Sequence, residues 1–183
     1  IAGSIGVQLV GALILFLRFL PDYGLQRAAA WGVFHAVSGF CNAGFDIFGS
    51  IGPGQSVILF NDDPVVLITL MALITVGGLG FFVYEYFTRA EIWVVSAGSP
   101  HIFVYTKLVL IATLVIITLG AGLILLLEWD NPATLGNMPW GQKILNSFFQ
   151  VVTLRTAGFA SVDQAALTDG TKALSMVIML IGG

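Results

Sequence analysis

Long apolar runs alternate along the chain with apolar runs of half that length. Residues 1–20 are apolar, and as a helix rising about 1.5 Å per residue they would reach about 30 Å, one hydrocarbon thickness. Residues 31–40 are also mostly apolar but would cross only half of a bilayer. A break at 41–46 follows, and the next long run covers 64–84. The pattern predicts a spanning helix, a half-helix, the first break (residues 41–46) and a second spanning helix.

The same order of elements returns in the second part of the chain. It consists of a spanning helix over 102–127, a half-helix over 144–154, the second break over 155–159 and a partial helix over 173–183. The intervening residues, 85–101, form an amphipathic connector. The chain therefore reads as a first copy, residues 1–84, and a second copy, residues 102–183.

The two breaks share the tripeptide Ala-Gly-Phe. An offset of 114 residues places Gly44 on Gly158, with Ala and Phe on either side of each glycine. The match elsewhere is weak residue by residue, so the order of elements carries more weight. The predicted fold class is an all-α membrane protein built from repeated membrane helix–pore half-helix–membrane helix units, as in pore-loop cation channels.

The composition narrows the class of protein. Hydrophobic residues make up 57% of the 183 residues, charged residues make up 9%, and the mean hydropathy is +0.97, which together indicate a multi-pass integral membrane protein. The net charge of −3 gives no reason to expect a nucleic-acid partner. The single cysteine, Cys41, excludes an internal disulfide framework. Both ends of the sequence fall within apolar runs, so we expect a piece of a longer protein.

Irregular backbone at membrane depth must be buried in protein or line a watery cavity. Neutral carbonyls there can replace the hydration shell of a monovalent cation, and the negative end of each half-helix dipole also favours a cation. Glycine supplies the unusual dihedral angles that such a segment needs. The candidate ion-binding residues are Asn42, Ala43, Gly44, Phe45, Thr156, Ala157, Gly158 and Phe159. No cofactor is expected.

Other residues near the breaks have expected supporting roles. We expect Cys41 and Arg155 to support the breaks from behind, with Arg155 paired to an acidic group or to carbonyls. His35, on the first half-helix, is expected to be hydrogen-bonded to a neighbour. Pro64 fits a first helical turn, and Asn61, Asp62 or Asp63 would cap that helix.

The stretches "FHAVSGFCNAGF" and "FFQVVTLRTAGF" resemble the second and third pore loops of the Ktr/Trk/HKT potassium transporters. The run "NDDPVVLITLMALITVGGLGF" is similar to that family's helix after the second loop. The resemblance implies four repeats around one pore, of which this chain holds the second and most of the third. The ion would be K⁺, bound by the carbonyls of the breaks, because a glycine at the positions of Gly44 and Gly158 favours potassium in this family.

The same resemblance implies a setting for the chain. It places the protein in the cell (inner) membrane, in contact with the lipid bilayer, with the connector 85–101 in the cytoplasm. It also implies a homodimer of pores and a cytoplasmic nucleotide-binding regulatory subunit. Cys41 stands where the family usually has asparagine, which puts one supporting bond in doubt. Two breaks cannot encircle an ion, so this polypeptide alone should not conduct.

Two other functions compete with the pore. A secondary transporter of another small solute would also use broken helices, although such proteins usually have inverted repeats and these repeats run parallel. An intramembrane enzyme could use His35 as a base for Ser38, three residues further on. That pair has no counterpart in the second copy, whereas the break does repeat. We therefore expect a transporter and not an enzyme.

Overall fold

The computed structural model describes residues 2–79 and 100–182, and within these ranges all regular structure is helical. The all-α class predicted from the hydropathy pattern is therefore confirmed for the described residues. Most of the connector predicted over 85–101, and the end of the helix predicted over 64–84, lie outside the described residues.

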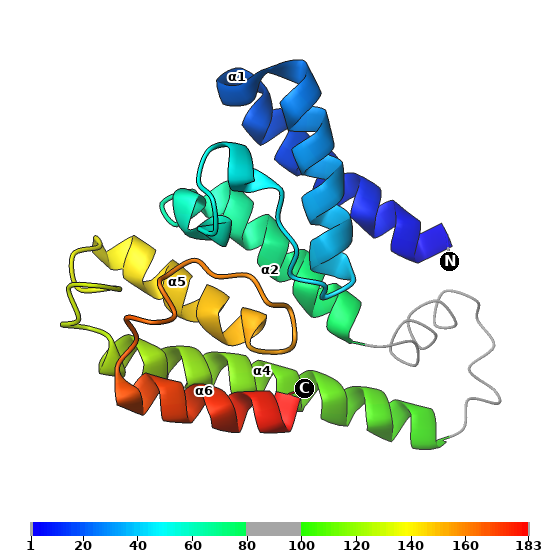
Figure 1. Ribbon diagram of the computed structural model, residues 1–183. Coiled ribbons are helices and arrows are strands. Elements are labelled where there is room, and N and C mark those ends of the chain that lie inside the picture. The colour runs from blue at the N-terminus through cyan, green and yellow to red at the C-terminus, as the bar shows by residue number, and fades with distance from the viewer. Residues whose placement is uncertain (1, 80–99, 183) are drawn as a thin grey trace.

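The first helix folds back on itself. Helix α1 runs over Ala2–Phe40, but Gly24 inside it has φ 77° and ψ 168°, and Figure 1 shows two limbs meeting at this point. A Cβ added to Gly32 would lie 2.8 Å from the Ala12 carbonyl oxygen, so the limbs touch through their backbones. The ten residues between the helices predicted over 1–20 and 31–40 are thus helical except at Gly24. Glycine can adopt this dihedral without strain, so the helix resumes at once and the limb leading to the first break is longer than predicted.

Helix α2 begins at a site that the sequence marks. It covers Pro64–Gly78, and Asp63 caps it by accepting hydrogen bonds from the N–H groups of Val65 and Val66 at 2.9 and 3.3 Å. The prediction of a cap at this helix is confirmed, with Asp63 as the capping residue. At its other end, a Cβ on Gly77 would overlap the carbonyl oxygen of Phe40. Helix α2 therefore packs closely against the end of α1, immediately before the first break.

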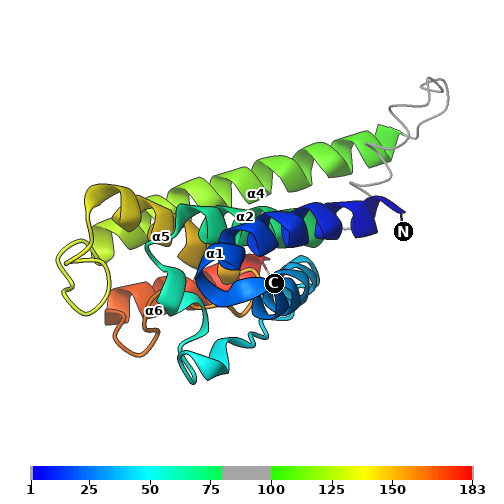
Figure 2. The ribbon, with the colours of Figure 1, turned by 90° about the horizontal axis from the view of Figure 1, so that it is seen from above.

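The second copy forms three helices. These are α4 (Pro100–Leu127), α5 (Trp140–Thr153) and α6 (Asp169–Gly182). Figures 1 and 2 show α6 running along α4, and α5 contacts both α2 and α4. Helices α5 and α6 start earlier than the predicted 144 and 173. Helix α5 begins directly after Pro139, whose backbone is extended, and α6 begins at Asp169, whose charge complements the helix dipole.

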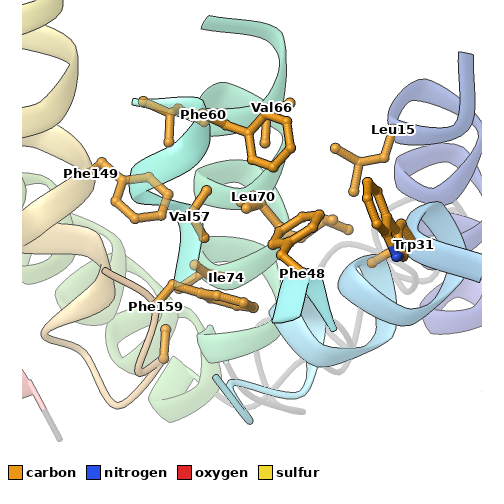
Figure 3. Close-up of a cluster of buried hydrophobic side chains, with 14 of the residues drawn as sticks. Leu15, Trp31, Phe48, Val57, Phe60, Val66, Leu70, Ile74, Phe149 and Phe159 are labelled. Atoms are coloured by element: carbon orange, nitrogen blue, oxygen red, sulfur yellow. The ribbon is translucent and has the colours of Figure 1, made fainter. Parts of the chain in front are cut away.

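A buried aromatic cluster joins the two copies. Figure 3 shows side chains from α1, from the loop before α2, from α2 and from the second copy meeting in one cluster. Its aromatic members with less than a tenth of their surface exposed are Phe19, Trp31, Phe48, Phe60, Phe149 and Phe159. Because the cluster contains residues from both copies, it fixes one copy against the other close to the two breaks.

Large apolar side chains cover the outside of the structure. By length and apolar composition, residues 104–127 of α4 could cross a membrane, and so could residues 3–40 of α1, which the fold-back at Gly24 divides into two limbs. Along α4, Leu108, Leu114, Leu119 and Leu126 are between 63% and 73% exposed. An apolar surface of this kind is costly in water and suits contact with lipid or with further membrane helices.

Candidate ion-binding site

The two breaks adopt the same unusual backbone conformation. In the first break Asn42 and Gly44 have φ of 51° and 69°, and in the second Thr156 and Gly158 have φ of 65° and 81°. The offset of 114 residues maps each of these residues onto its counterpart. Positive φ is rare for a residue other than glycine, so the coincidence at Asn42 and Thr156 marks a shared, specified conformation. The breaks are therefore alike in structure as well as in sequence.

This conformation leaves a row of carbonyl groups unpaired. When φ alternates in sign along a segment, successive N–H groups converge on one side, and the carbonyls are turned to the other. Among the described residues, no hydrogen-bond donor reaches the carbonyl oxygens of residues 42–44 or of residues 156–158. Within the same ranges no group of three His, Cys, Asp or Glu side chains could hold a metal ion. The unpaired oxygens of the described breaks are thus these carbonyls together with Asn42 Oδ1, which is buried without a hydrogen-bond partner.

The two glycines of the breaks lie in direct contact. A Cβ added to Gly44 would overlap the Ala157 carbonyl oxygen and lie 2.8 Å from the Cα of Gly158. A Cβ added to Gly158 would lie 3.2 Å from the Cα of Gly44. Residues that are 114 positions apart in the sequence thus meet backbone to backbone. Glycine is required at both positions by the positive φ and by this close approach.

A hydroxyl group supports each break from its half-helix. Ser38 donates from Oγ to the carbonyl of Phe45 at 2.7 Å, and Thr153 donates from Oγ1 to the carbonyl of Phe159 at 2.6 Å. We had assigned the carbonyls of both phenylalanines to ion binding, and the structure engages them with these hydroxyls. Sequence analysis missed this role of Ser38 and Thr153. The available signal was a hydroxyl residue in the last turn of each half-helix, six or seven positions before the phenylalanine.

The phenylalanines differ in their side chains. Phe159 is 2% exposed and belongs to the buried cluster, so it packs behind the second break. Phe45 is 70% exposed in this chain. The two breaks therefore share a backbone conformation but not the packing of their aromatic rings.

His35 holds the chain that leaves the first break. Its Nδ1 lies 2.7 Å from the Trp31 carbonyl oxygen and acts as donor, which leaves Nε2 to accept the N–H of Ile47 at 3.3 Å. The ring is 1% exposed and stacks on Phe48 with centroids 4.0 Å apart. The prediction that His35 is hydrogen-bonded to a neighbour is confirmed.

These bonds also bear on the enzyme alternative. Both ring nitrogens of His35 are engaged with backbone groups, and the Ser38 proton is donated to Phe45. No hydrogen bond joins Ser38 to His35, so the nucleophile–base pair that an enzyme would need is not formed.

Replacement of His35 by phenylalanine should distinguish the contribution of its hydrogen bonds to stability from that of its ring stack. Phenylalanine, which the offset places at this position in the second copy as Phe149, keeps the stack but cannot accept the Ile47 N–H. An unpaired buried donor costs about 1–3 kcal/mol, so we expect His35→Phe to lower the unfolding free energy by that amount. Thermal unfolding in detergent measures it, with Val33→Ala, whose side chain is 55% exposed on the same helix, as the control. An unchanged unfolding midpoint would mean that the hydrogen bonds of the His35 ring do not contribute to the stability of the fold.

Cys41 and Arg155 occupy different surroundings. The Cys41 side chain is exposed, and support of the first break comes instead from Ser38 and His35. Arg155 reaches between the ends of two helices: a Cβ on Gly182 would lie 3.2 Å from its Cγ, and one on Gly78 would lie 3.9 Å from Nη2. The acidic or carbonyl partner that we expected for Arg155 is not found among residues 2–79 and 100–182.

Comparison with known proteins identifies similar chains. The family described as TrkH, cation transport protein, matches residues 4–183. The Ktr system potassium uptake protein B of Vibrio alginolyticus is 38% identical over 175 residues, which cover 96% of this chain and 36% of that protein. The protein of the same name from Bacillus subtilis (strain 168) is 34% identical over 180 residues, covering 98% of this chain and 38% of that protein.

A third relative carries a different name. The potassium/sodium uptake protein NtpJ of Enterococcus hirae is 31% identical over 180 residues, covering 98% of this chain and 37% of that protein. The chain thus spans a little over a third of the length of these curated relatives, and the match extends over nearly all of the chain.

Proposed function

The chain belongs to the TrkH family of cation transport proteins, and on this premise we propose that its two breaks line part of a pore for K⁺. The family consists of transporters and not of enzymes. The observation that carries the proposal is the pair of matching breaks, which share one backbone conformation and meet where Gly44 contacts Gly158.

The chemistry of the breaks suits a weakly held cation. Carbonyl oxygens can replace the water around a dehydrated K⁺ ion, and being neutral they release it again, as conduction requires. The half-helices α5 and the second limb of α1 both end at a break, so the negative ends of their dipoles favour a cation there. The proposed ligands are the carbonyls of residues 42–44 and 156–158. Phe45 and Phe159 would act through the backbone that their hydroxyl partners fix.

The choice of ion rests on the glycines and on the relatives. Two of the similar proteins are named for potassium uptake, and one is named for potassium and sodium. The glycines at 44 and 158 match the pattern that favours potassium by resemblance. We therefore propose potassium as the main transported ion, with sodium as the competitor to be tested.

The architecture that we propose follows the repeat. Residues 1–84 and 102–183 would be successive membrane helix–pore half-helix–membrane helix units, joined by a cytoplasmic connector at 85–101. The segments that complete a ring around the ion would come from the rest of the transporter. The intact protein would lie in the cell membrane as a homodimer and would meet a cytoplasmic nucleotide-binding subunit.

Ion flux into liposomes tests the proposal. The intact protein that carries this chain is reconstituted, and K⁺ uptake is measured in the presence of increasing Na⁺. We expect K⁺ flux that Na⁺ inhibits only weakly. We also expect K⁺ to raise the thermal unfolding midpoint above that in choline, because a ligand that binds the folded state stabilises it.

A different result would favour the second candidate. Flux of an uncharged or anionic solute, without any K⁺ current or K⁺-dependent stabilisation, would support a secondary transporter of another small solute. Such an outcome would remove the pore proposal while leaving the family assignment in place.

A further inference from the structure

A loop of the first copy is hydrogen-bonded to the chain that leaves the second break. The backbone N–H of Val57 donates to the Ala160 carbonyl at 3.0 Å, and the N–H of Ala160 donates to Ser56 Oγ at 3.2 Å. Ala160 follows Gly158 by two positions, whereas Ser56 is 104 residues away in the sequence. We name this pair of bonds the Ser56 clasp, formed by Ser56, Val57 and Ala160.

The backbone at Ser56 is held in a conformation that serine rarely adopts. Its φ is 49°, and the short helix over Ser56–Phe60 begins at this residue. A left-handed dihedral in a residue other than glycine persists when surrounding contacts determine it. Val57 next to it is fully buried, and Figure 3 shows it in the same cluster as Phe159. The strained residue is thus fixed both by the clasp and by the buried cluster.

The second break is fastened at successive residues on the side where the chain leaves it. Thr153 holds the Phe159 carbonyl, and the clasp holds both the N–H and the carbonyl of Ala160. Ser38 and His35, which hold the first break, both belong to its own half-helix, whereas the second break is held by its half-helix at Thr153 and also by the first copy through the clasp. The clasp is therefore a connection through which the first copy sets the position of the second break.

We propose that Ser56 is a positioning residue for ion selectivity. By fixing Ala160, its hydroxyl sets how closely Gly158 approaches Gly44, and so sets the spacing of the carbonyls that would bind the ion. This inference rests on the proposed potassium function. It gives the loop that contains Ser56, which lies outside both breaks, a role in the discrimination between K⁺ and Na⁺.

The variant Ser56→Gly separates positioning from folding. Glycine has no hydroxyl to accept the Ala160 N–H, but it adopts positive φ without strain, and because this gain offsets the lost hydrogen bond the variant should be about as stable as the wild type. The matched control is Gly54→Ala in the same loop. Gly54 has φ +74° and nothing within 4 Å of an added Cβ, so alanine strains the loop without touching the clasp.

Two measurements on the intact transporter test the proposal. For Ser56→Gly we expect the K⁺ over Na⁺ flux ratio to fall about threefold to tenfold, the effect of losing one hydrogen bond. Hydrogen–deuterium exchange at Ala160 should become faster, while the thermal unfolding midpoint stays close to that of the wild type. For Gly54→Ala we expect a lower midpoint with an unchanged flux ratio and unchanged exchange at Ala160.

The possible failures can be told apart. A wild-type transporter that does not distinguish K⁺ from Na⁺ would overturn the proposed function. A selective wild type together with an equally selective Ser56→Gly variant would overturn the role of Ser56 alone. Equal loss of selectivity in Ser56→Gly and Gly54→Ala would also overturn it, because loop stability and not the clasp would then be the cause.

Discussion

Substitution of Gly44 by serine is expected to abolish potassium uptake or to lower the K⁺ over Na⁺ flux ratio by at least about tenfold. The added Cβ would overlap the Ala157 carbonyl oxygen and lie 2.8 Å from the Cα of Gly158. Both obstacles are backbone atoms, so neither can be moved by rotating a side chain. The positive φ of 69° adds strain of about 1–3 kcal/mol for a residue with a side chain.

The result should depend on which glycine is changed. At Gly158 an added Cβ would meet the Cα of Gly44 at 3.2 Å, a tight contact that a shift of a few tenths of an ångström relieves. We therefore expect Gly158→Ser to reduce selectivity less than Gly44→Ser. The matched control is Gly49→Ser, where an added Cβ has nothing within 4 Å. Flux and its Na⁺ competition should stay at the wild-type level in the control.

Uptake assays with the intact transporter in liposomes measure these effects, and protein recovered after reconstitution corrects for folding. If Gly44→Ser is well folded and as selective as the wild type, the contact between the two breaks does not lie on the path of the ion. The same holds if Gly49→Ser is as impaired as Gly44→Ser, because a general loop effect would then explain both.

The hydropathy pattern was enough to predict the helical class, because helices and closed barrels alone satisfy their backbone groups inside lipid. Local chemistry also predicted the start of α2, where Asp63 and Pro64 supply a cap and a first-turn residue. The predicted breaks fall outside the helices of the structure, which end at Phe40 and Thr153. Each of these predictions depends on residues that are close together in the sequence.

Features that depend on residues far apart in sequence were not predictable in this way. Nothing local to Gly44 says that it will touch Gly158, and nothing in the loop at Ser56 points to Ala160. The fold-back of α1 at Gly24 was also not predicted, because residues 21–30 were left between the helices predicted over 1–20 and 31–40. One glycine with φ 77° was sufficient to reverse the helix.

The buried position of Glu128 could not be predicted from the hydropathy pattern. It is fully buried just beyond the end of α4. Its Oε2 accepts from Thr134 Oγ1 at 2.6 Å and from Asn131 Nδ2 at 2.7 Å. Its Oε1 accepts from the N–H and Oγ1 of Thr168 at 2.8 and 2.7 Å. One carboxylate thus joins the end of α4 to the start of α6.

These bonds govern the charge of the residue. Burial alone would raise the pKa of Glu128, but hydrogen bonds from three threonines outweigh it and lower the pKa to about 2. A carboxyl group whose pKa is lower in the folded state stabilises the fold above its unfolded pKa, near 4.5. That contribution is lost progressively as the pH falls from 4.5 toward about 2.

Removal of Glu128 should therefore destabilise the second copy strongly. We expect Glu128→Ala to lower the unfolding free energy by about 3–5 kcal/mol at neutral pH, because several buried donors lose a charged acceptor together. Glu128→Gln keeps the shape but not the charge and should cost less, about 1–3 kcal/mol. Thermal unfolding in detergent between pH 3 and 7 measures both effects.

The pH dependence distinguishes the carboxylate from its packing. The wild type should lose more stability than Glu128→Gln as the pH falls below 4.5, so that the two unfolding midpoints converge in acid. Asp130→Asn is the matched control, since Asp130 is two residues further on and exposed, and its midpoint should follow the wild type at every pH. Parallel curves for the wild type and Glu128→Gln would mean that the charge of Glu128 does not hold α4 to α6.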